Sequence, residues 1–171
     1  CVEEWGVSIV NDIGGGTLDP AMWDTVADLR VAYVLMHMRG TPKTMGTLTD
    51  YNDVSADTLT DLAFRISELR SKGVSDVIID PGFGFAKTVE QNYRLLADLR
   101  EFRITGAPVL AGISRKTMIW KPLGITPAEA ANGTTALNTV ALLNGADILR
   151  VHDVRNAVET VKLMELLKND K

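Results

Sequence analysis

The stretch VIIDPGFGFAKT, residues 77–88, joins an apolar run to features that a core strand does not need. Val77–Ile79 is typical of a buried strand, and Asp80 then ends it on a carboxylate followed by proline and two glycine–phenylalanine pairs. A carboxylate in this place either caps the next turn or accepts paired hydrogen bonds from a planar amidine- or guanidine-like edge. This stretch alone favours neither interpretation, so the other strand ends decide.

Five short runs rich in Val, Ile and Leu predict strands, and none of them alternates cleanly with polar residues. This is typical of a parallel sheet that is covered on both faces. The runs are residues 7–10, 32–38, 76–79, 108–111 and 147–151. Helical patterns separate them, with a predicted helix start at Asp19-Pro20 and capping-box spacing after Thr88 and Thr126. The repeated strand–helix order predicts an α/β fold with right-handed crossovers.

The strand ends distinguish two architectures. In an open doubly wound sheet, ligand groups gather at one switch point, whereas in a (β/α)₈ TIM barrel every strand can contribute at its C-terminal end. All five runs end in polar or charged groups, which favours the barrel. The five ends are Asn11 to Gly16, Met36 to Gly40, Asp80 to Phe85, Gly112 to Lys116 and Arg150 to Asp153.

The chain length sets how much of a barrel these residues form. A barrel has eight βα units and typically about 250 residues, whereas this chain has 171 residues and about five units. We therefore expect residues 1–171 to form the C-terminal portion of a single barrel domain, with three N-terminal strands missing.

Composition excludes several classes of protein. The net charge is −4 and the basic residues are scattered, so we expect no nucleic-acid partner. No apolar run approaches the roughly 20 residues needed to cross a bilayer, so no membrane partner is expected. Cys1 is the only cysteine, which excludes an intrachain disulfide and a cysteine-based zinc cluster and fits a cytoplasmic setting.

Several rim side chains suit a flat polar heterocycle beside an anionic group. Asn11 offers both a donor and an acceptor to a mixed edge, and Lys116 can donate to a carbonyl or a ring nitrogen. Arg150 and His152 are two residues apart, so they are predicted to face the same side of the last strand. Together they would form an anion site for phosphate or pyrophosphate.

Other conspicuous residues have competing interpretations. Phe85 is predicted to stack on a ligand, whereas Phe83 is predicted to be core. Met36 is expected to be mostly core, with the option of lying under a flat ring. His37 is interpreted as an ordinary core or surface histidine. Lys87 is expected to be a solvated lysine in the first turn of a helix.

Two segments between the predicted elements also carry expectations. Asp12 is predicted to brace the Gly14–Gly16 loop, where glycine permits a tight turn and the phosphate-loop signal is weak. Residues 39–56 have no clear element, and a loop of this length is usually a lid or a binding loop. Arg115 is expected to point away from Ser114 and Lys116 and to be structural.

Taken together, these motifs resemble the dihydropteroate synthases of folate biosynthesis. The resemblance rests on DPGFGF-x-K from Asp80, G-x-SRK from Gly112 and RVHD from Arg150, together with Asn11-Asp12 and Met36-His37-Met38. It runs over essentially the whole chain, in order and with matching spacing. It implies a pterin-binding (β/α)₈ barrel that condenses 6-hydroxymethyl-7,8-dihydropterin pyrophosphate with 4-aminobenzoate, giving 7,8-dihydropteroate and pyrophosphate.

The resemblance also implies a role for each matching residue. The catalytic residues would be Asp80, Lys116, Arg150 and His152. The pterin would be bound by Asn11, Met36, Asp80, Gly84, Gly112 and Lys116. The aminobenzoate pocket would be shaped by Phe85, Ser114 and Thr117. Pyrophosphate would be held by Arg150 and His152.

Further expectations concern metal and partners. The family uses Mg²⁺ to assist pyrophosphate, is a sulfonamide target, and forms homodimers through late helices, here those after Gly112 and Arg150. Its metal-associated asparagine and a pterin-binding aspartate lie in N-terminal strands without a counterpart here. No metal ligand is therefore expected in this chain, and the 171 residues alone are expected to be inactive. The alternatives are a methyltetrahydrofolate–corrinoid methyltransferase and a non-catalytic barrel homologue.

Overall fold

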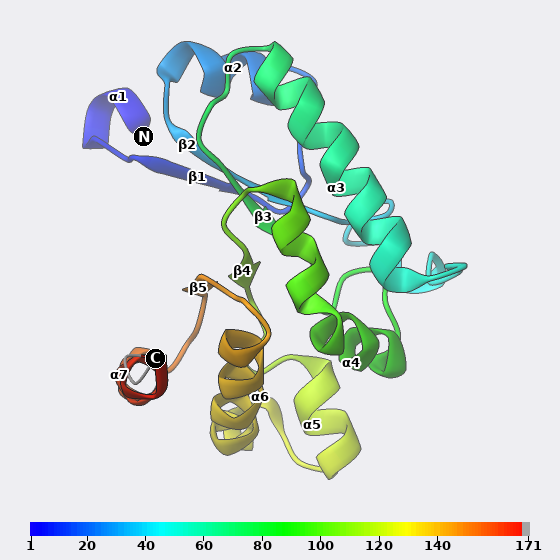
Figure 1. The fold of residues 1–171 in the computed structure, drawn as a ribbon. Helices are drawn as coiled ribbons and strands as arrows, with labels where there is room; N and C mark the ends of the chain where they lie inside the picture. The colour runs from blue at the N-terminus through cyan, green and yellow to red at the C-terminus, as the bar shows by residue number, and fades with distance from the viewer. Residues whose placement is uncertain (169–171) are drawn as a thin grey trace.

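A computed structural model describes residues 1–168 as alternating strands and helices (Figure 1). The strands are β1 (Ile9–Asp12), β2 (Ala32–Met36), β3 (Val77–Asp80), β4 (Leu110–Ala111) and β5 (Ile148–Leu149). The α-helices are α1 (Val2–Trp5), α2 (Met22–Leu29), α3 (Val54–Ser71), α4 (Val89–Ala97), α5 (Thr117–Leu123), α6 (Ala131–Leu143) and α7 (Val154–Lys168). Short 3₁₀ helices are η1 (Met45–Thr47), η2 (Leu99–Thr105) and η3 (Pro127–Glu129).

All strand pairs are parallel, and the strands follow one another in chain order. β1, β2 and β3 form one sheet, and β4 and β5 form a second. A single bridge between Ile79 and Val109 joins the two sheets, with the Ile79 amide donating to Pro108 O over 2.9 Å. The order therefore runs β1 to β5 without a reversal, which is the arrangement of a barrel and not of a doubly wound sheet.

The five strands form an arc with helices along its outer side (Figure 1). Over residues 1–168, β1 pairs only with β2 and β5 only with β4, so the arc is open. This agrees with the predicted portion of a barrel. None of the helices in this part of the chain is both long and apolar enough to traverse a bilayer.

The two faces of the strands have different roles. Tyr33 and Leu35 of β2 and Ile79 of β3 are fully buried against the helices, in a core that includes Leu62 and Leu69 of α3. Because side chains alternate along a strand, the intervening residues point to the inner side of the arc. The inner side is therefore the face from which a barrel presents functional groups at its rim.

Several element boundaries differ from the sequence-based expectation. β1 begins at Ile9 instead of Val7, and β4 begins at Leu110 instead of Pro108, since Val109 makes only an isolated bridge to Ile79. β2 ends at Met36 instead of Met38, and β5 has only the two residues Ile148 and Leu149. α2 begins at Met22, since Asp19 accepts from the Ala21 amide at 2.9 Å in a turn that precedes the helix.

The capping boxes predicted at Thr88 and Thr126 are confirmed, and glycines occupy the turns before β3 and β5. Both capping boxes form, although the one at Thr126 opens η3 instead of an α-helix. Gly73 and Gly145 have φ values of 93° and 97°, a region that strongly favours glycine.

Candidate functional site

Strand register places four of the predicted site residues on the inner side of the arc. Asn11 pairs with Val34 in β1–β2, and Met36 pairs with Asp80 in β2–β3. These residues alternate with the helix-facing Leu35 and Ile79, so they share the inner face. The same alternation places Arg150 beyond β5 on that face, because Leu149 packs against the helices.

Asp80 is the centre of this inner face. Its side chain is fully buried, and its two oxygens accept from different donors. Oδ1 accepts from the Gly82 amide at 2.8 Å, and Oδ2 accepts from Arg150 Nη2 at 2.9 Å. Arg150 Nη1 also donates to Asn11 Oδ1 at 2.5 Å. Asp80 therefore caps its own turn and faces the rim at once, so the two interpretations of its carboxylate are compatible.

Lys116 approaches the same carboxylate from the β4 side. Its Nζ donates to Phe83 O and lies 4.6 Å from the centre of the Phe85 ring. Burial lowers the pKa of Lys116 to about 8, with the Arg150 guanidinium acting in the same direction and Asp80 opposing both. Lys116 is the N-cap residue of α5, so the strand does not continue from Ser114 to Lys116.

Two glycines give these cationic side chains their space. A Cβ on Gly112 would lie 2.6 Å from Arg150 Nη2 and 3.1 Å from Arg150 Cζ. A Cβ on Gly84 would lie 3.0 Å from Lys116 Cδ, and Gly84 also has a φ of 76°. Any larger residue at either position would move a site cation.

His152 and Ser114 form a second polar group at the end of β5. Ser114 Oγ lies 3.0 Å from His152 Nδ1, and it accepts from the His152 amide at 3.1 Å. Arg115 donates to both carboxylate oxygens of Asp153 at 2.7 and 3.0 Å, which confirms its structural role. His152 and Arg150 thus have different protein partners although they lie on one strand end.

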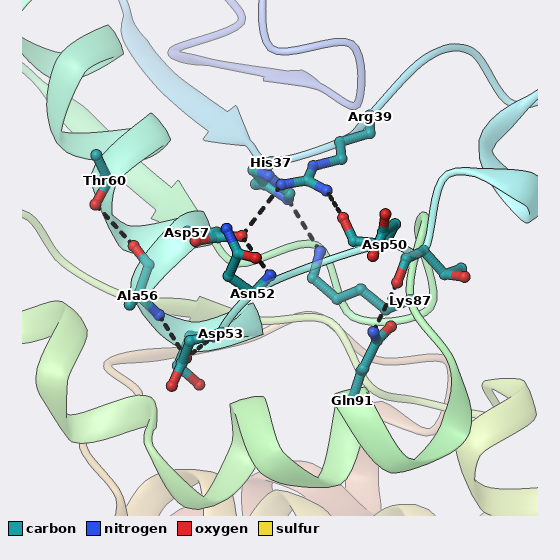
Figure 2. Close-up of polar contacts among 12 residues, drawn as sticks. His37, Arg39, Asp50, Asn52, Asp53, Ala56, Asp57, Thr60, Lys87 and Gln91 are labelled. Carbon is teal, nitrogen blue, oxygen red and sulfur yellow. Dashed lines mark hydrogen bonds and ion pairs between the residues drawn. The ribbon is translucent and has the colours of Figure 1, made fainter.

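A cavity of about 1030 Å³ opens beside the Phe85 loop. Its wall includes Gly84, Thr117, Tyr93 and Lys121, so Thr117 borders the same space as the site glycine. Met45, Gly46 and Thr49 line it from the 39–56 segment. That segment is fixed by Arg39, which donates to Asp50 O, and by Gln91, whose Nε2 donates to Thr49 O at 2.8 Å (Figure 2).

Asp12, Met36 and Phe83 lie as expected, whereas stacking of Phe85 on a ligand stays a prediction. Asp12 accepts from the Gly14 and Gly16 amides at 2.8 and 2.6 Å, so it braces the glycine loop. Phe83 is fully buried, whereas Phe85 is half-buried at the rim. Met36 is buried beside Asp80 in the register.

The prediction of a solvated Lys87 was wrong. Lys87 is 9% exposed, and its side chain turns back toward His37 (Figure 2). Asn92 of α4 was also missed as a loop-holding residue, although its Oδ1 accepts from the Gly84 amide at 2.6 Å. A glycine-rich turn leaves backbone groups without regular partners. The glycines of this loop therefore indicate that nearby polar side chains, such as Asn92, must bind its backbone.

The family follows from a comparison with known protein families. The model of a family described as pterin binding enzyme matches residues 1–152. The chain belongs to this pterin-binding enzyme family. The barrel predicted from the strand ends is therefore confirmed at the level of the family and of the strand order.

Several relatives of this chain are named dihydropteroate synthase. Dihydropteroate synthase of Synechocystis is 41% identical over 165 residues, which are 95% of this chain and 57% of that protein. Dihydropteroate synthase of Escherichia coli is 38% identical over 162 residues, which are 94% of this chain and 57% of that protein. The chain therefore spans about three-fifths of the length of these curated relatives.

Solved structures of similar proteins agree with the fold. Yersinia pestis dihydropteroate synthase, described with a sulfonamide drug complex, has a TM-score of 0.93 at 34% identity, over 97% of this chain and 61% of that one. The Thermus thermophilus enzyme in complex with 6HMPPP has a TM-score of 0.90 at 39% identity, over 95% of this chain and 65% of that one. The chain thus shares their architecture over almost its whole length.

Proposed function

We propose that this chain is part of a dihydropteroate synthase. It would condense 6-hydroxymethyl-7,8-dihydropterin pyrophosphate with 4-aminobenzoate, releasing pyrophosphate. The observation that carries the proposal is the buried Asp80 carboxylate, which shares the inner face with Asn11 and lies 2.9 Å from Arg150. The names of the relatives at 38 and 41% identity support the same reaction.

The inner face suits the recognition of a pterin. A buried carboxylate beside an amide side chain can read a heterocycle that presents adjacent N–H donors and a carbonyl. In this proposal Asp80 and Asn11 bind the amino-pyrimidine edge and Lys116 donates to the pterin oxygen and a ring nitrogen. Met36, Gly84 and Gly112 complete the pterin surface.

The remaining site residues divide between the other two groups. Arg150 and His152 would hold pyrophosphate through charge-assisted hydrogen bonds. Phe85, Ser114 and Thr117 would shape the pocket for 4-aminobenzoate, supported by the position of Thr117 on the wall of the 1030 Å³ cavity. A sulfonamide, which has the shape of an aminobenzoate, would compete for that pocket.

The proposed chemistry is dissociative. The C–O bond to pyrophosphate breaks first and its electron pair leaves with the pyrophosphate, while the dihydropterin delocalises the positive charge on its methylene carbon. The aniline nitrogen of 4-aminobenzoate then forms the C–N bond and loses a proton. The side chains need only stabilise separating charge, with Arg150 and His152 on the leaving group and Asp80 on the pterin.

Magnesium stays an expectation of the family resemblance. In the described part of the chain, residues 1–168, no three His, Cys, Asp or Glu side chains gather in a group that could hold a metal ion. These residues therefore do not fit a metal held by protein ligands alone, and no chemical step depends on it here.

Association and location also belong to the proposal. A homodimer through α6 and α7 is supported by the exposed apolar side chains Leu143, Leu163 and Leu166, which a partner would cover. A cytoplasmic location is supported by the lone cysteine, Cys1.

The test is a calorimetric titration of a complete eight-stranded barrel protein that contains these residues, because the 171 residues alone are expected to be inactive. The protein is titrated first with the pterin pyrophosphate and then with 4-aminobenzoate. We expect the pterin to bind and the aminobenzoate to bind well only in the presence of pyrophosphate. Absence of pterin binding would refute the function, and strong aminobenzoate binding without pyrophosphate would contradict the order of assembly.

A further inference from the structure

The buried Lys87 ammonium has no part in the function proposed above. It lies beneath the 81–86 loop, which follows β3 and carries Gly84 and Phe85. Its Nζ is 3.0 Å from His37 Nδ1, 3.2 Å from Gly82 O and 3.2 Å from Phe85 O. An ammonium has three N–H donors, so each of its donors has one protein acceptor. With an ammonium opposite it, His37 Nδ1 accepts and the ring proton lies on Nε2.

The 81–86 loop has one backbone hydrogen bond of its own, from the Phe85 amide to Gly82 O at 3.1 Å, and side chains supply further partners for its backbone groups. Gly82, Gly84 and Ala86 have φ values of 75°, 76° and 49°, so the loop has no regular structure. Asn92 accepts from the Gly84 amide, and Lys87 donates to the carbonyls of Gly82 and Phe85. Lys87 thus bonds to carbonyl groups near both ends of the loop, at Gly82 and Phe85.

Lys87 also ties this loop to the neighbouring strand end. A Cβ on Gly82 would lie 2.0 Å from His37 O, so the loop packs directly on the backbone that follows β2. The His37 amide donates to Asp80 O at 2.9 Å. The Lys87–His37 contact therefore adds a side-chain link between the end of β2 and the loop that carries Gly84 and Phe85.

We propose that Lys87 is a positioning residue that fixes the 81–86 loop, so that Asp80, Gly84 and Phe85 keep the arrangement needed for the pterin and aminobenzoate. This inference rests on the proposed function. Lys87 acts through the loop, because all of its ammonium protons are directed at protein acceptors. Loss of these bonds is expected to loosen the loop while the barrel strands stay in place.

The charge of Lys87 is expected to change near neutral pH. The pKa of Lys87 is lowered to about 7, mainly by burial and to a smaller extent by Lys116 and Arg39, while Asp80 and Asp61 act in the opposite direction. The charged and titratable groups around it are His37, Arg39, Tyr51, Asp61, Asp80 and Lys116. Above about pH 7 the amine keeps only two N–H donors for three acceptors, so the loop should loosen as pH rises.

The first experiment compares Lys87→Met with Lys162→Met in the full chain. Lys162 is exposed on α7 and serves as the matched control. Without any ligand, amide exchange at Gly84 and Phe85 should become about tenfold faster or more in Lys87→Met only, as loss of bonds from a charged donor would produce. The dissociation constant for the pterin pyrophosphate should rise by about 10- to 100-fold. Wild-type exchange and affinity in Lys87→Met would overturn the proposal.

A second measurement uses the wild-type chain and does not depend on the folding of a variant. Exchange at Gly84 and Phe85 is followed from pH 6 to 9 and corrected for the intrinsic pH dependence of exchange. Protection should fall as pH rises through about 7, while amides in the middle of α3 keep theirs. Protection that stays constant over this range would overturn the role of Lys87.

These readouts separate the two proposals. If the wild-type chain does not bind the pterin pyrophosphate, the proposed function fails. The ligand-free exchange data still decide whether Lys87 holds the loop. If pterin binds and only the Lys87→Met variant behaves as wild type, the proposed function stands and the positioning role is refuted.

Discussion

Arg150 Nη2 lies 2.9 Å from Asp80 Oδ2, so the side chain proposed to hold pyrophosphate contacts the carboxylate proposed to read the pterin. Asp80 is fully buried, whereas the Arg150 side chain is 37% exposed. A buried carboxylate with a partly solvated guanidinium is well placed to exchange that partner for a ligand edge. The two recognition tasks are thereby linked through one contact.

Asp80→Ala should abolish pterin binding while the fold is retained. The variant removes the carboxylate that would accept from the pterin, and truncation of one member of a hydrogen-bonded charge pair typically costs about 2–5 kcal/mol of binding energy. Calorimetry should show affinity reduced by at least about 30-fold. The exposed Asp28→Ala variant should bind as wild type. If Asp80→Ala instead unfolds, the carboxylate is mainly a turn cap.

Gly112→Ala should weaken binding of the pyrophosphate-bearing substrate by about tenfold. A methyl group would lie 2.6 Å from Arg150 Nη2, and the flexible arginine must move away. Ser67→Ala on the exposed face of α3 is the control, because it lies outside the site. Equal affinities for the two variants would show that Arg150 does not need its present position.

Pterin affinity should fall as pH rises through about 8, the lowered pKa of Lys116. Below this pH the Lys116 ammonium can donate to the pterin with its full charge. Above it, the charged fraction of Lys116 falls by up to about tenfold for each further pH unit. In a Lys87→Met background, where the 81–86 loop no longer responds to the charge of Lys87, Lys116→Arg should lose this decline because a guanidinium stays protonated. The decline should persist in Lys162→Arg and in Lys87→Met. A decline that also persists in the double variant would assign it to another group.

Stability should decrease on acidification below about pH 6.5 because of His37. Burial lowers the pKa of His37 to about 2, with Lys87 acting in the same direction. In the unfolded chain the His37 imidazole binds a proton near pH 6.5, whereas in the folded chain it stays neutral until a much lower pH. The free energy of unfolding therefore rises with pH between these two values. Urea unfolding from pH 5 to 7 should give a slope that is smaller in His37→Gln, and identical slopes would contradict the prediction.

The sequence was sufficient for the features that follow from alternation and strand order. Asp80 and Arg150 end apolar runs in phase with the inner face, so their convergence could be predicted from spacing alone. The cap at Thr88 was also predictable, because its capping box is a local contact between residues three apart.

The rest depended on contacts between distant residues. Lys87 resembles a solvated helix-start lysine until the left-handed turn at Gly82 and Gly84 places acceptors around its ammonium. His37, fifty residues earlier, supplies the third acceptor. No local pattern encodes that geometry. The start of α2 was misplaced for the opposite reason, since Asp19 satisfied the Ala21 amide in a turn and left the helix to begin later.

The Ile79–Val109 bridge has a mechanical consequence for the site. It is the one strand pairing between the β1–β3 sheet and the β4–β5 sheet in the described residues. Asp80 follows Ile79 directly, whereas Lys116 and Arg150 come from the other sheet. Any rotation about this joint changes the separation of Asp80 from both cations. A substrate held by all three side chains would therefore act as a cross-brace between the two halves of the arc.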